Sequence, residues 1–252
     1  MEAPPTASAP LPKLEVLDRS DPQSFQPPVK KINDGPDVNH FLASKAYRDI
    51  GLFTMQLNRA MCPRWAPASE DAAAKPTPRI WSKWDPIPGS PVDKLGQLMT
   101  RIESFITEAP PNTGPRRFGN VSFRTWCGLL EERAPALMEE FLPGEVLSFP
   151  VAAGAGKAQD ELTAYFLGGF GSAQRLDYGT GHELSFLAFL GCLWKLGAFA
   201  SMEQDGPVER GIVLGVIEPY GSLHFSPYLQ IPLYLSYDPG LSCTYSQTGT
   251  SK

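Results

Sequence analysis

The sequence has few of the residues that build metal centres or disulfide frameworks. Only three histidines occur in 252 residues, and the four cysteines lie far apart with no paired spacing: Cys62, Cys127, Cys192 and Cys243. This pattern argues against both a zinc site and a disulfide-stabilised fold. It predicts instead a protein of a reducing compartment, in the cytoplasm and the nucleus.

Basic charge and long apolar runs are also lacking. Lysine and arginine total 22 against 27 acidic residues, which gives a net charge of −5. No basic stripe is available to replace the counterions of a nucleic acid, so we expect no nucleic-acid partner. No apolar run reaches the roughly 20 residues of a membrane span, and the amino terminus has no secretory-signal pattern. We therefore expect no membrane partner, and a monomer that binds a protein or a small molecule.

Proline, by contrast, is abundant, with 26 residues, and much of it lies in segments that cannot build a core. Residues 1–32 hold proline, serine, alanine and charge with few large apolar side chains, which predicts a flexible arm. Its candidates for docking on a folded domain are Leu14, Val16 and Leu17. The similar composition of residues 66–78 predicts an exposed linker.

Apolar residues at helical spacing dominate the rest of the chain. They predict one long amphipathic helix that starts at Pro36 and runs to Met61. A second helix should begin at Ser90, where Asp93 stands at the capping-box spacing, and should end at Pro110.

Three more helices are expected further along. The first covers residues 122–141, where Pro135 should kink or divide it. A short one covers residues 159–167. The last follows Asp177, runs to Leu196 and is apolar nearly all round, so it should be a central buried helix. Strand patterns are scarce, and the predicted fold class is therefore all-α, as a helical bundle.

One segment just before the buried helix combines residue types that chemistry uses: Asp177-Tyr178-Gly179-Thr180-Gly181-His182-Glu183. A structural interpretation explains part of it, because Thr180 and Glu183 have the spacing of a capping box. It leaves Asp177, Tyr178 and His182 without a role, while the glycines allow a ligand or another chain to approach the backbone. Spacing alone leaves the structural and the functional interpretations both open.

Residues 177–186 closely resemble the signature of the phosphotyrosyl phosphatase activators, also called type 2A phosphatase activators. A second block, Arg116-Arg117-Phe118-Gly119-Asn120 followed by Phe123-Arg124-Thr125-Trp126, resembles the other motif of that family. The run Ile32-Asn33-Asp34-Gly35-Pro36-Asp37 is similar to the amino-terminal part of fungal members. The resemblance covers roughly residues 14–220, about four-fifths of the chain.

The resemblance implies a single all-α domain with core, linker and lid parts around a deep groove. It also implies an activator that binds the catalytic subunit of type 2A or 2A-like serine/threonine phosphatases and alters its conformation or metal loading. Members use ATP with Mg²⁺ at the shared surface and act as peptidyl-prolyl cis–trans isomerases on proline-containing peptide segments.

The family motifs, carried onto this sequence, imply roles for individual residues. Asp177 and Glu183 match acidic positions associated with magnesium, and Arg117 matches a basic position associated with the nucleotide phosphate. The expected catalytic residues are Asp177, Tyr178 and His182. The groove would be lined by Gly179, Thr180, Gly181, Phe118, Gly119 and Asn120. The residues alone equally allow Arg117 to be an ordinary surface charge.

Prolyl isomerisation breaks no covalent bond and needs no nucleophile. Its barrier of roughly 18–20 kcal/mol comes from the amide resonance that is lost as the bond twists. An apolar groove that desolvates the carbonyl, with a donor to the twisted nitrogen, lowers that barrier, and Tyr178 and His182 are candidate donors. The alternative is binding alone, in which the protein holds one conformer of the phosphatase without turnover.

The last stretch departs from the family. A member continues into further helices after the equivalent of Tyr220, whereas residues 221–252 carry only two formal charges, Asp238 and Lys252. They show neither helix caps nor a sustained period, which predicts a poorly ordered tail after an incomplete helical domain over residues 33–220. Apolar faces should then be exposed. A non-catalytic binding module or an inactive truncated product remains the alternative function.

Overall fold

The structure is a computed structural model that describes residues 12–65, 78–114, 120–202 and 206–225. Over these residues it is helical, which confirms the predicted all-α class, apart from one antiparallel pair of two-residue strands. The elements in chain order are α1 (Gly35–Leu42), α2 (Lys45–Met61), β1 (Arg64–Trp65), β2 (Pro78–Arg79), α3 (Pro91–Ser104), the 3₁₀-helix η1 (Phe105–Thr107), α4 (Ser122–Phe141), α5 (Gly144–Leu147), α6 (Ala158–Gly168), α7 (Thr180–Lys195), α8 (Pro207–Ile212), the π-helix η2 (Val213–Ile217) and α9 (Glu218–Phe225).

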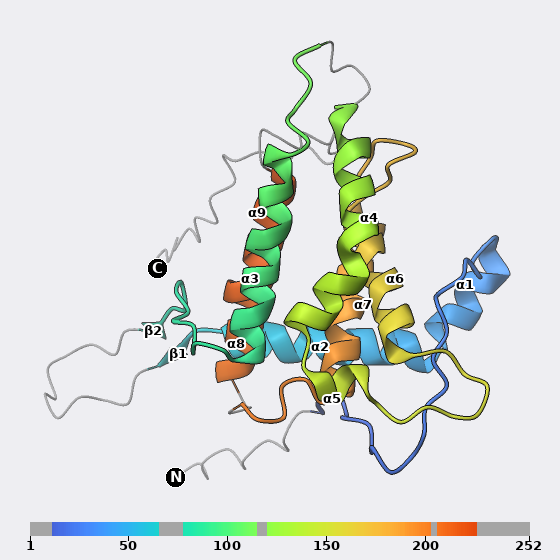
Figure 1. The fold of residues 1–252 in the computed structure, drawn as a ribbon. Coiled ribbons are helices and arrows are strands. Elements are labelled where there is room, and N and C mark those ends of the chain that lie inside the picture. The colour runs from blue at the N-terminus through green and yellow to red at the C-terminus, as the bar shows by residue number, and fades with distance from the viewer. Residues whose placement is uncertain (1–11, 66–77, 115–119, 203–205, 226–252) are drawn as a thin grey trace, which may run out of the picture.

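The helices pack as a bundle that one helix crosses. Figure 1 shows α3 and α4 side by side, with α9 against α3, with α6 against α4 and α7 against α6, and with α2 crossing the lower part of the bundle, where it contacts α7 and α8. The core between them is largely aromatic: Trp126, Phe166, Phe170 and Phe189 are each at most 1% exposed. Among the described residues, no helix combines the length and the apolarity needed to cross a lipid bilayer.

The single long helix predicted from Pro36 to Met61 is wrong, because two helices occupy this stretch. Ser44 has extended backbone, and its hydroxyl accepts a hydrogen bond from Tyr47 N at 3.1 Å, so it caps the start of α2. Asp34 caps α1 in the same way. A capping residue leaves the helical conformation, so a second cap inside a periodic stretch divides the helix.

The other predicted helices are confirmed. Ser90 caps α3 by accepting a hydrogen bond from Asp93 N at 3.2 Å. Helix α4 runs without division through Pro135, and α6 and α7 lie within a few residues of their predicted ranges. The buried side of α7 consists of large apolar residues, each at most 2% exposed: Phe186, Phe189, Leu190, Leu193 and Trp194. This helix is therefore the central one, as its apolar sequence predicts.

Part of the segment that precedes α1 is docked on the bundle. Leu14 is 4% exposed, and its carbonyl accepts a hydrogen bond from the indole of Trp194 at 2.9 Å. The backbone N–H of Leu17 donates to the carbonyl of Lys195 at 2.7 Å. Leu14 and Leu17 thus dock on the bundle as predicted, whereas the third predicted residue, Val16, is 46% exposed.

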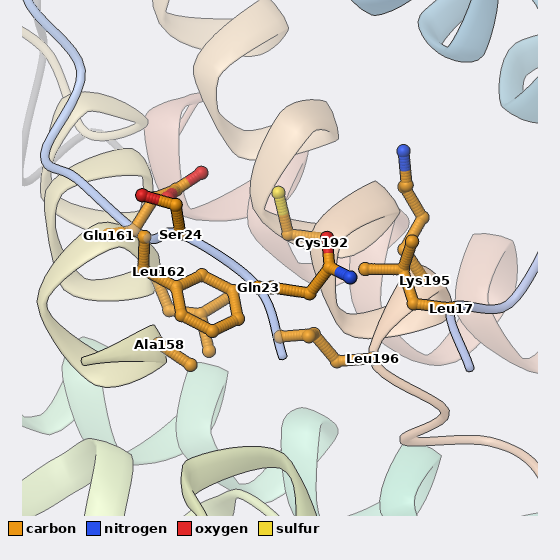
Figure 2. Close-up of a pocket in the computed structure, with 10 residues that line it drawn as sticks. Leu17, Gln23, Ser24, Ala158, Glu161, Leu162, Cys192, Lys195 and Leu196 are labelled. Atoms are coloured by element: carbon orange, nitrogen blue, oxygen red, sulfur yellow. The ribbon is translucent and has the colours of Figure 1, made fainter. Parts of the chain in front are cut away.

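A small cavity of about 180 Å³ lies where this segment crosses α6 and α7. Figure 2 shows Ser24 of the segment beside Glu161 of α6 and Gln23 beside Cys192 of α7, while the Lys195 side chain points away from both. Burial raises the pKa of the Cys192 thiol to about 12, so this sulfur stays protonated at neutral pH. The cavity therefore offers no reactive thiolate.

Three consecutive helical elements, α8, η2 and α9, form a stretch that the sequence pattern did not predict. Pro219 explains why the middle element is a π-helix, since proline has no N–H to give the carbonyl of Gly215. The preceding N–H, that of Glu218, bonds instead to Val213 O, five residues back. Residues 221–225 of the expected tail are therefore helical, while residues 226–252 lie outside the described part of the chain.

Candidate functional site

The turn that leads into α7 is closed by a tight backbone contact. The N–H of Ser172 donates to Asp177 O at 2.9 Å, and Leu176 adopts a left-handed conformation with φ of 55°. Gly171, with φ of 100°, lies so close that an added Cβ would be 2.9 Å from Asp177 O and 3.1 Å from the ring of Phe123. Only glycine fits at this point, and the turn is held against α4.

Arg124 of α4 ties the second family-like block to this turn. Its Nε donates to Ala173 O at 3.0 Å, and its Nη2 lies 3.4 Å from Gln174 O. The described end of the arginine block and the acidic, glycine-rich turn are thus side by side, although about 50 residues of chain separate them. Arg117, Phe118 and Gly119, predicted site residues of the same block, lie outside the described residues.

Asn120 is inside the protein and organises the start of α4. It is 3% exposed, and its side-chain oxygen accepts hydrogen bonds from Asn112 N at 3.0 Å and Ser122 N at 3.1 Å. Its amide nitrogen has no hydrogen-bond partner among the described residues. The structure gives Asn120 a positioning role for this loop.

Asp177 is already engaged in an ion pair. Its Oδ2 accepts a hydrogen bond from Arg175 Nε at 2.7 Å, while Oδ1 is buried and has no partner within the described residues. Glu183 is exposed on the first turn of α7. No group of three histidine, cysteine or acidic side chains that could hold a metal occurs in the described part of the chain. Since Mg²⁺ requires six oxygen ligands, Asp177 and Glu183 could supply only part of such a site.

Tyr178 and Tyr220 join α7 to α9 through a buried chain of hydroxyl groups. The two hydroxyls are 2.9 Å apart, and that of Tyr220 donates to Gly169 O at 2.5 Å. A phenol has one proton, so Tyr178 must donate to Tyr220 in this arrangement. Burial raises the pKa of Tyr178 to about 12, and burial together with the Tyr178 hydrogen bond raises the pKa of Tyr220, so both stay protonated at neutral pH.

His182 is fixed by a carbonyl group one helix away. Its Nδ1 lies 2.7 Å from Gly168 O, and its ring stacks on Tyr178 with centroids 5.8 Å apart. A carbonyl can only accept, so Nδ1 carries a proton and Nε2 of the neutral ring is an acceptor. His182 can therefore donate to a ligand from Nε2 only when it is an imidazolium.

The capping-box interpretation of Thr180 and Glu183 is wrong. Gly179, not Thr180, is the N-cap of α7, and no side chain caps this helix. The carbonyl of Gly179 accepts from His182 N at 2.8 Å and from Glu183 N at 3.4 Å. Thr180 and Gly181 are exposed on the first turn, and neither an added Cβ at Gly179 nor one at Gly181 would meet any atom within 4 Å. The start of α7 is thus open to an approaching molecule.

An apolar groove begins at Tyr178 and runs between α7 and the η2–α9 stretch. We call it the α7–α9 groove; it has a volume of about 270 Å³ and is lined by Tyr178, Glu183, Phe186, Leu187, Leu190, Ile217, Tyr220 and Gly221. The rings of Phe186 and Tyr220 stack in parallel with centroids 3.8 Å apart. Glu183 is the one charged residue in the lining, so the groove suits an uncharged, extended chain segment.

Only two of the lining residues, Tyr178 and Glu183, are predicted from the sequence as site residues. The other six are Phe186, Leu187, Leu190, Ile217, Tyr220 and Gly221. Tyr220 is the last residue of the predicted helical domain, although it touches the predicted Tyr178 directly. The sequence gives only a weak indication that Tyr220 is buried, namely the apolar run from Gly211 to Ile217 that precedes it. Because Tyr178 and Tyr220 are 42 residues apart, only the packing of α9 brings them together.

Fold and site together define a class: a helical protein with an apolar groove beside an acidic, glycine-rich turn. The family model described as phosphotyrosyl phosphate activator (PTPA) protein matches residues 28–233. The chain therefore belongs to the phosphotyrosyl phosphatase activator family, which confirms the resemblance.

The similar proteins agree with this family. Proteins named serine/threonine-protein phosphatase 2A activator 1 from Aspergillus fumigatus and Emericella nidulans are 50% and 48% identical, over 84% and 83% of this chain. The crystal structure of the PP2A phosphatase activator Ypa1 PTPA1 matches with a TM-score of 0.60 and 28% identity, over 84% of this chain and 58% of that one. The two fungal matches cover 44% and 47% of those relatives, so the chain spans about half the length of the curated relatives it matches.

Proposed function

We propose that this chain binds the catalytic subunit of a type 2A or 2A-like serine/threonine phosphatase and activates it. The observation that carries the proposal is the apolar α7–α9 groove, which begins at Tyr178 of the acidic, glycine-rich turn. Arg124 of the second family block bonds the loop just before that turn, at Ala173 O. The names of the fungal relatives support it, since they are phosphatase 2A activators. The surface around the start of α7 would meet the phosphatase, and the groove would take up an apolar segment of it.

The chain would activate the phosphatase by binding one of its states more tightly than the others. A ligand shifts a conformational equilibrium only as far as it prefers one state over the other. If the groove accepts a phosphatase segment in only one conformer, or in only one metal-loading state, binding stabilises that state. This mechanism needs no catalytic turnover, and it corresponds to the alternative of a non-catalytic binding module.

Prolyl isomerisation is the second candidate function, and the apolar lining of the groove favours it. Desolvation of the prolyl carbonyl weakens amide resonance and so lowers the barrier to rotation. The proton of Tyr178 is engaged by Tyr220, and the Nδ1 proton of His182 is engaged by Gly168 O. A donor role of either residue toward the twisted nitrogen would thus require a change of partner or an imidazolium, and we assign most of the effect to the groove.

We further propose that ATP with Mg²⁺ binds at the shared surface, not in this chain alone. Asp177 and Glu183 would contribute carboxylate oxygens, Arg117 would bind a phosphate group, and the nucleotide and the phosphatase would complete the coordination. Asp177 would have to exchange Arg175 for the metal, since that arginine now occupies Oδ2.

The three described cysteines are free thiols, which supports a cytoplasmic and nuclear location.

Two leucines provide a matched test of phosphatase binding. Leu187 lines the groove, whereas Leu42, at the end of α1, is 48% exposed and does not. We expect Leu187→Gln to weaken binding to the purified catalytic subunit at least tenfold in calorimetry, and Leu42→Gln to change it less than twofold. Thermal unfolding of both variants identifies any general loss of structure. Equal binding by two folded variants would contradict the proposal.

Isomerase activity is tested separately with a proline-containing peptide. We expect the wild-type chain to accelerate isomerisation above the spontaneous rate and Leu187→Gln to reduce this effect. Asp177→Asn, which keeps the shape of the side chain, separates a role of its charge from a role of the groove. If the wild-type chain binds the phosphatase but leaves the peptide rate unchanged, the chain is a binding module and not an isomerase.

A further inference from the structure

The α7–α9 groove lies next to the point where the described chain ends. Gly221, the last lining residue, is four residues before Phe225, at the end of α9. The chain then continues for residues 226–252. We propose that the segment Tyr228–Tyr237 of this same chain folds back and occupies the groove. This inference rests on the proposed function and adds regulation to it: the segment is a built-in competitor of the phosphatase.

The composition of the segment matches the groove. Residues 228–237, Tyr-Leu-Gln-Ile-Pro-Leu-Tyr-Leu-Ser-Tyr, carry no formal charge, and seven of the ten are large apolar or aromatic residues. The groove is lined by aromatic and aliphatic side chains with one carboxylate, that of Glu183. The hydroxyls of Tyr234 and Tyr237 are donors that this rim carboxylate can accept from. No charge on the segment would have to be desolvated on entry.

Two prolines favour the extended backbone conformation that a peptide adopts when it binds in a groove. Pro227 and Pro232 both restrict the residue before them to extended conformations and remove backbone donors. A sequence with this proline spacing favours an extended conformation, which peptides adopt in other aromatic-lined grooves.

The chain length allows the return. Residues 226–230 span up to about 17 Å when extended, whereas the four helical steps from Gly221 to Phe225 cover only about 6 Å. Ile231 can therefore lie beside the groove with slack in the connection. The α7 wall from Glu183 to Leu190 is about 10 Å long, which about three extended residues cover, so the segment is long enough to span it. A tethered segment also has an effective concentration in the millimolar range, which favours it over a partner in solution.

Photo-crosslinking of the full-length chain tests the location. A photoreactive phenylalanine analogue replaces Tyr234, and the same analogue at Tyr245, outside the segment, serves as the control. We expect Tyr234 crosslinks within one chain to residues 183–190 or 217–221, found by mass spectrometry of the monomer band, and few such links from Tyr245. Crosslinks confined to a dimer band, which would indicate a second copy, or links elsewhere would overturn the proposal.

Phosphatase affinity tests the regulation. We expect Leu233→Asp with Leu235→Asp, in the full chain, to tighten binding to the purified catalytic subunit about tenfold, because the competitor leaves the groove. Ser246→Asp with Ser251→Asp adds the same charge outside the segment and should leave the affinity unchanged. If Tyr234 crosslinks form but affinity does not rise, the competition is refuted. If crosslinks are absent while the Leu187 test succeeds, the back-folding is refuted and the proposed function stands.

Discussion

At Gly211 and Gly215 the indole ring of Trp84 occupies the space that side chains would need. A Cβ at Gly211 would lie 2.8 Å from Trp84 Nε1, and one at Gly215 would lie 2.7 Å from the same ring. The carbonyl of Gly215 in turn lies 3.1 Å from the position of a Cβ on Gly96 of α3. Three glycines thus let α3, η2 and the segment before α3 approach one another closely, which fixes the position of α9 and of Tyr220.

Gly215→Ala should destabilise the protein for this reason. Overpacking a close contact costs about 1–3 kcal/mol, so we expect the free energy of unfolding to fall by that amount in urea denaturation. Gly51→Ala is the matched control, because Gly51 is in the interior of α2 with nothing within 4 Å of its Cβ position. There the change should stabilise by up to about 1 kcal/mol. If the free energy of unfolding of Gly215→Ala equals that of the wild type, Trp84 moves aside at little cost.

Tyr220→Phe isolates the buried hydroxyl chain. It keeps the ring that stacks on Phe186, but it leaves Gly169 O and the Tyr178 hydroxyl without the hydrogen bonds they make now. A buried group that loses a partner costs about 1–3 kcal/mol, and two groups are affected, so we expect a loss of about 2–6 kcal/mol in chemical denaturation. Tyr178→Phe, which leaves the Tyr220–Gly169 bond in place, should cost less. Equal losses would contradict the proton order Tyr178 to Tyr220 to Gly169.

Among the elements, α2 and α7 are joined by charge as well as by apolar packing. Asp49 of α2 accepts hydrogen bonds from Lys195 at 2.5 Å and from Arg48 at 3.0 Å. Burial alone would raise the pKa of Asp49, but these two hydrogen bonds outweigh it and hold the pKa below its ordinary value. Lys195 is the last residue of α7, where a positive charge also suits the helix dipole.

The pH dependence of stability follows from this shift. The lowered pKa means that the folded state binds the Asp49 proton less readily than the unfolded state does. The contribution of the carboxylate is therefore complete above the unfolded pKa of about 3.9 and disappears as the pH falls through the lower folded value. We expect the stability difference between wild type and Asp49→Asn to be constant near neutral pH and to shrink below about pH 4. A difference that does not change with pH would show that Asp49 acts through packing alone.

The helices that the sequence predicted have strong local signals, whereas the missed stretch has weaker ones, namely Pro207 at the start of α8 and Glu209, which accepts from Gly206 N. Ser90 with Asp93 marks the start of α3, and the apolar residues of α7 identify it as buried. The α8–α9 stretch was missed because Pro219 looks like a helix breaker, while the chain accommodates it with a π-turn. The groove was beyond prediction for a different reason, since Tyr178 and Tyr220 come from elements that only tertiary packing joins.

Over the whole molecule, one buried polar chain connects three segments that are distant in sequence. Gln56 of α2 accepts a hydrogen bond from Leu14 N at 3.1 Å and donates to Glu209 of α8 at 3.0 Å. Glu209 is 1% exposed and also accepts from Gly206 N at 2.8 Å. The docked amino-terminal segment, the crossing helix and the helix that leads to the groove are therefore one cooperative unit.

Gln56→Leu should weaken the contacts of α2 with both the amino-terminal segment and α8. It leaves Leu14 N and one Glu209 oxygen without a partner in the interior, at a cost of about 2 kcal/mol or more. We expect faster tryptic cleavage after Arg19, whose side chain now donates to Glu145 O at 2.6 Å. Gln97→Leu, on the exposed side of α3, is the control and should leave the cleavage rate unchanged. An unchanged rate in Gln56→Leu would mean that the other contacts of the segment, such as those with Trp194, Lys195 and Glu145, hold it without Gln56.

The contact between Leu14 and Trp194 also constrains how the protein is made. The two residues are 180 positions apart, so the docking partner of Leu14 does not exist until α7 has been synthesised. At about 5–20 residues per second, a ribosome needs roughly 10–40 s to extend the nascent chain from one to the other. During that interval the residues of α7 that contact Leu14 and Leu17 in the folded protein have not been synthesised. Chaperones that bind short apolar stretches would be able to bind the segment around Leu14 during that interval.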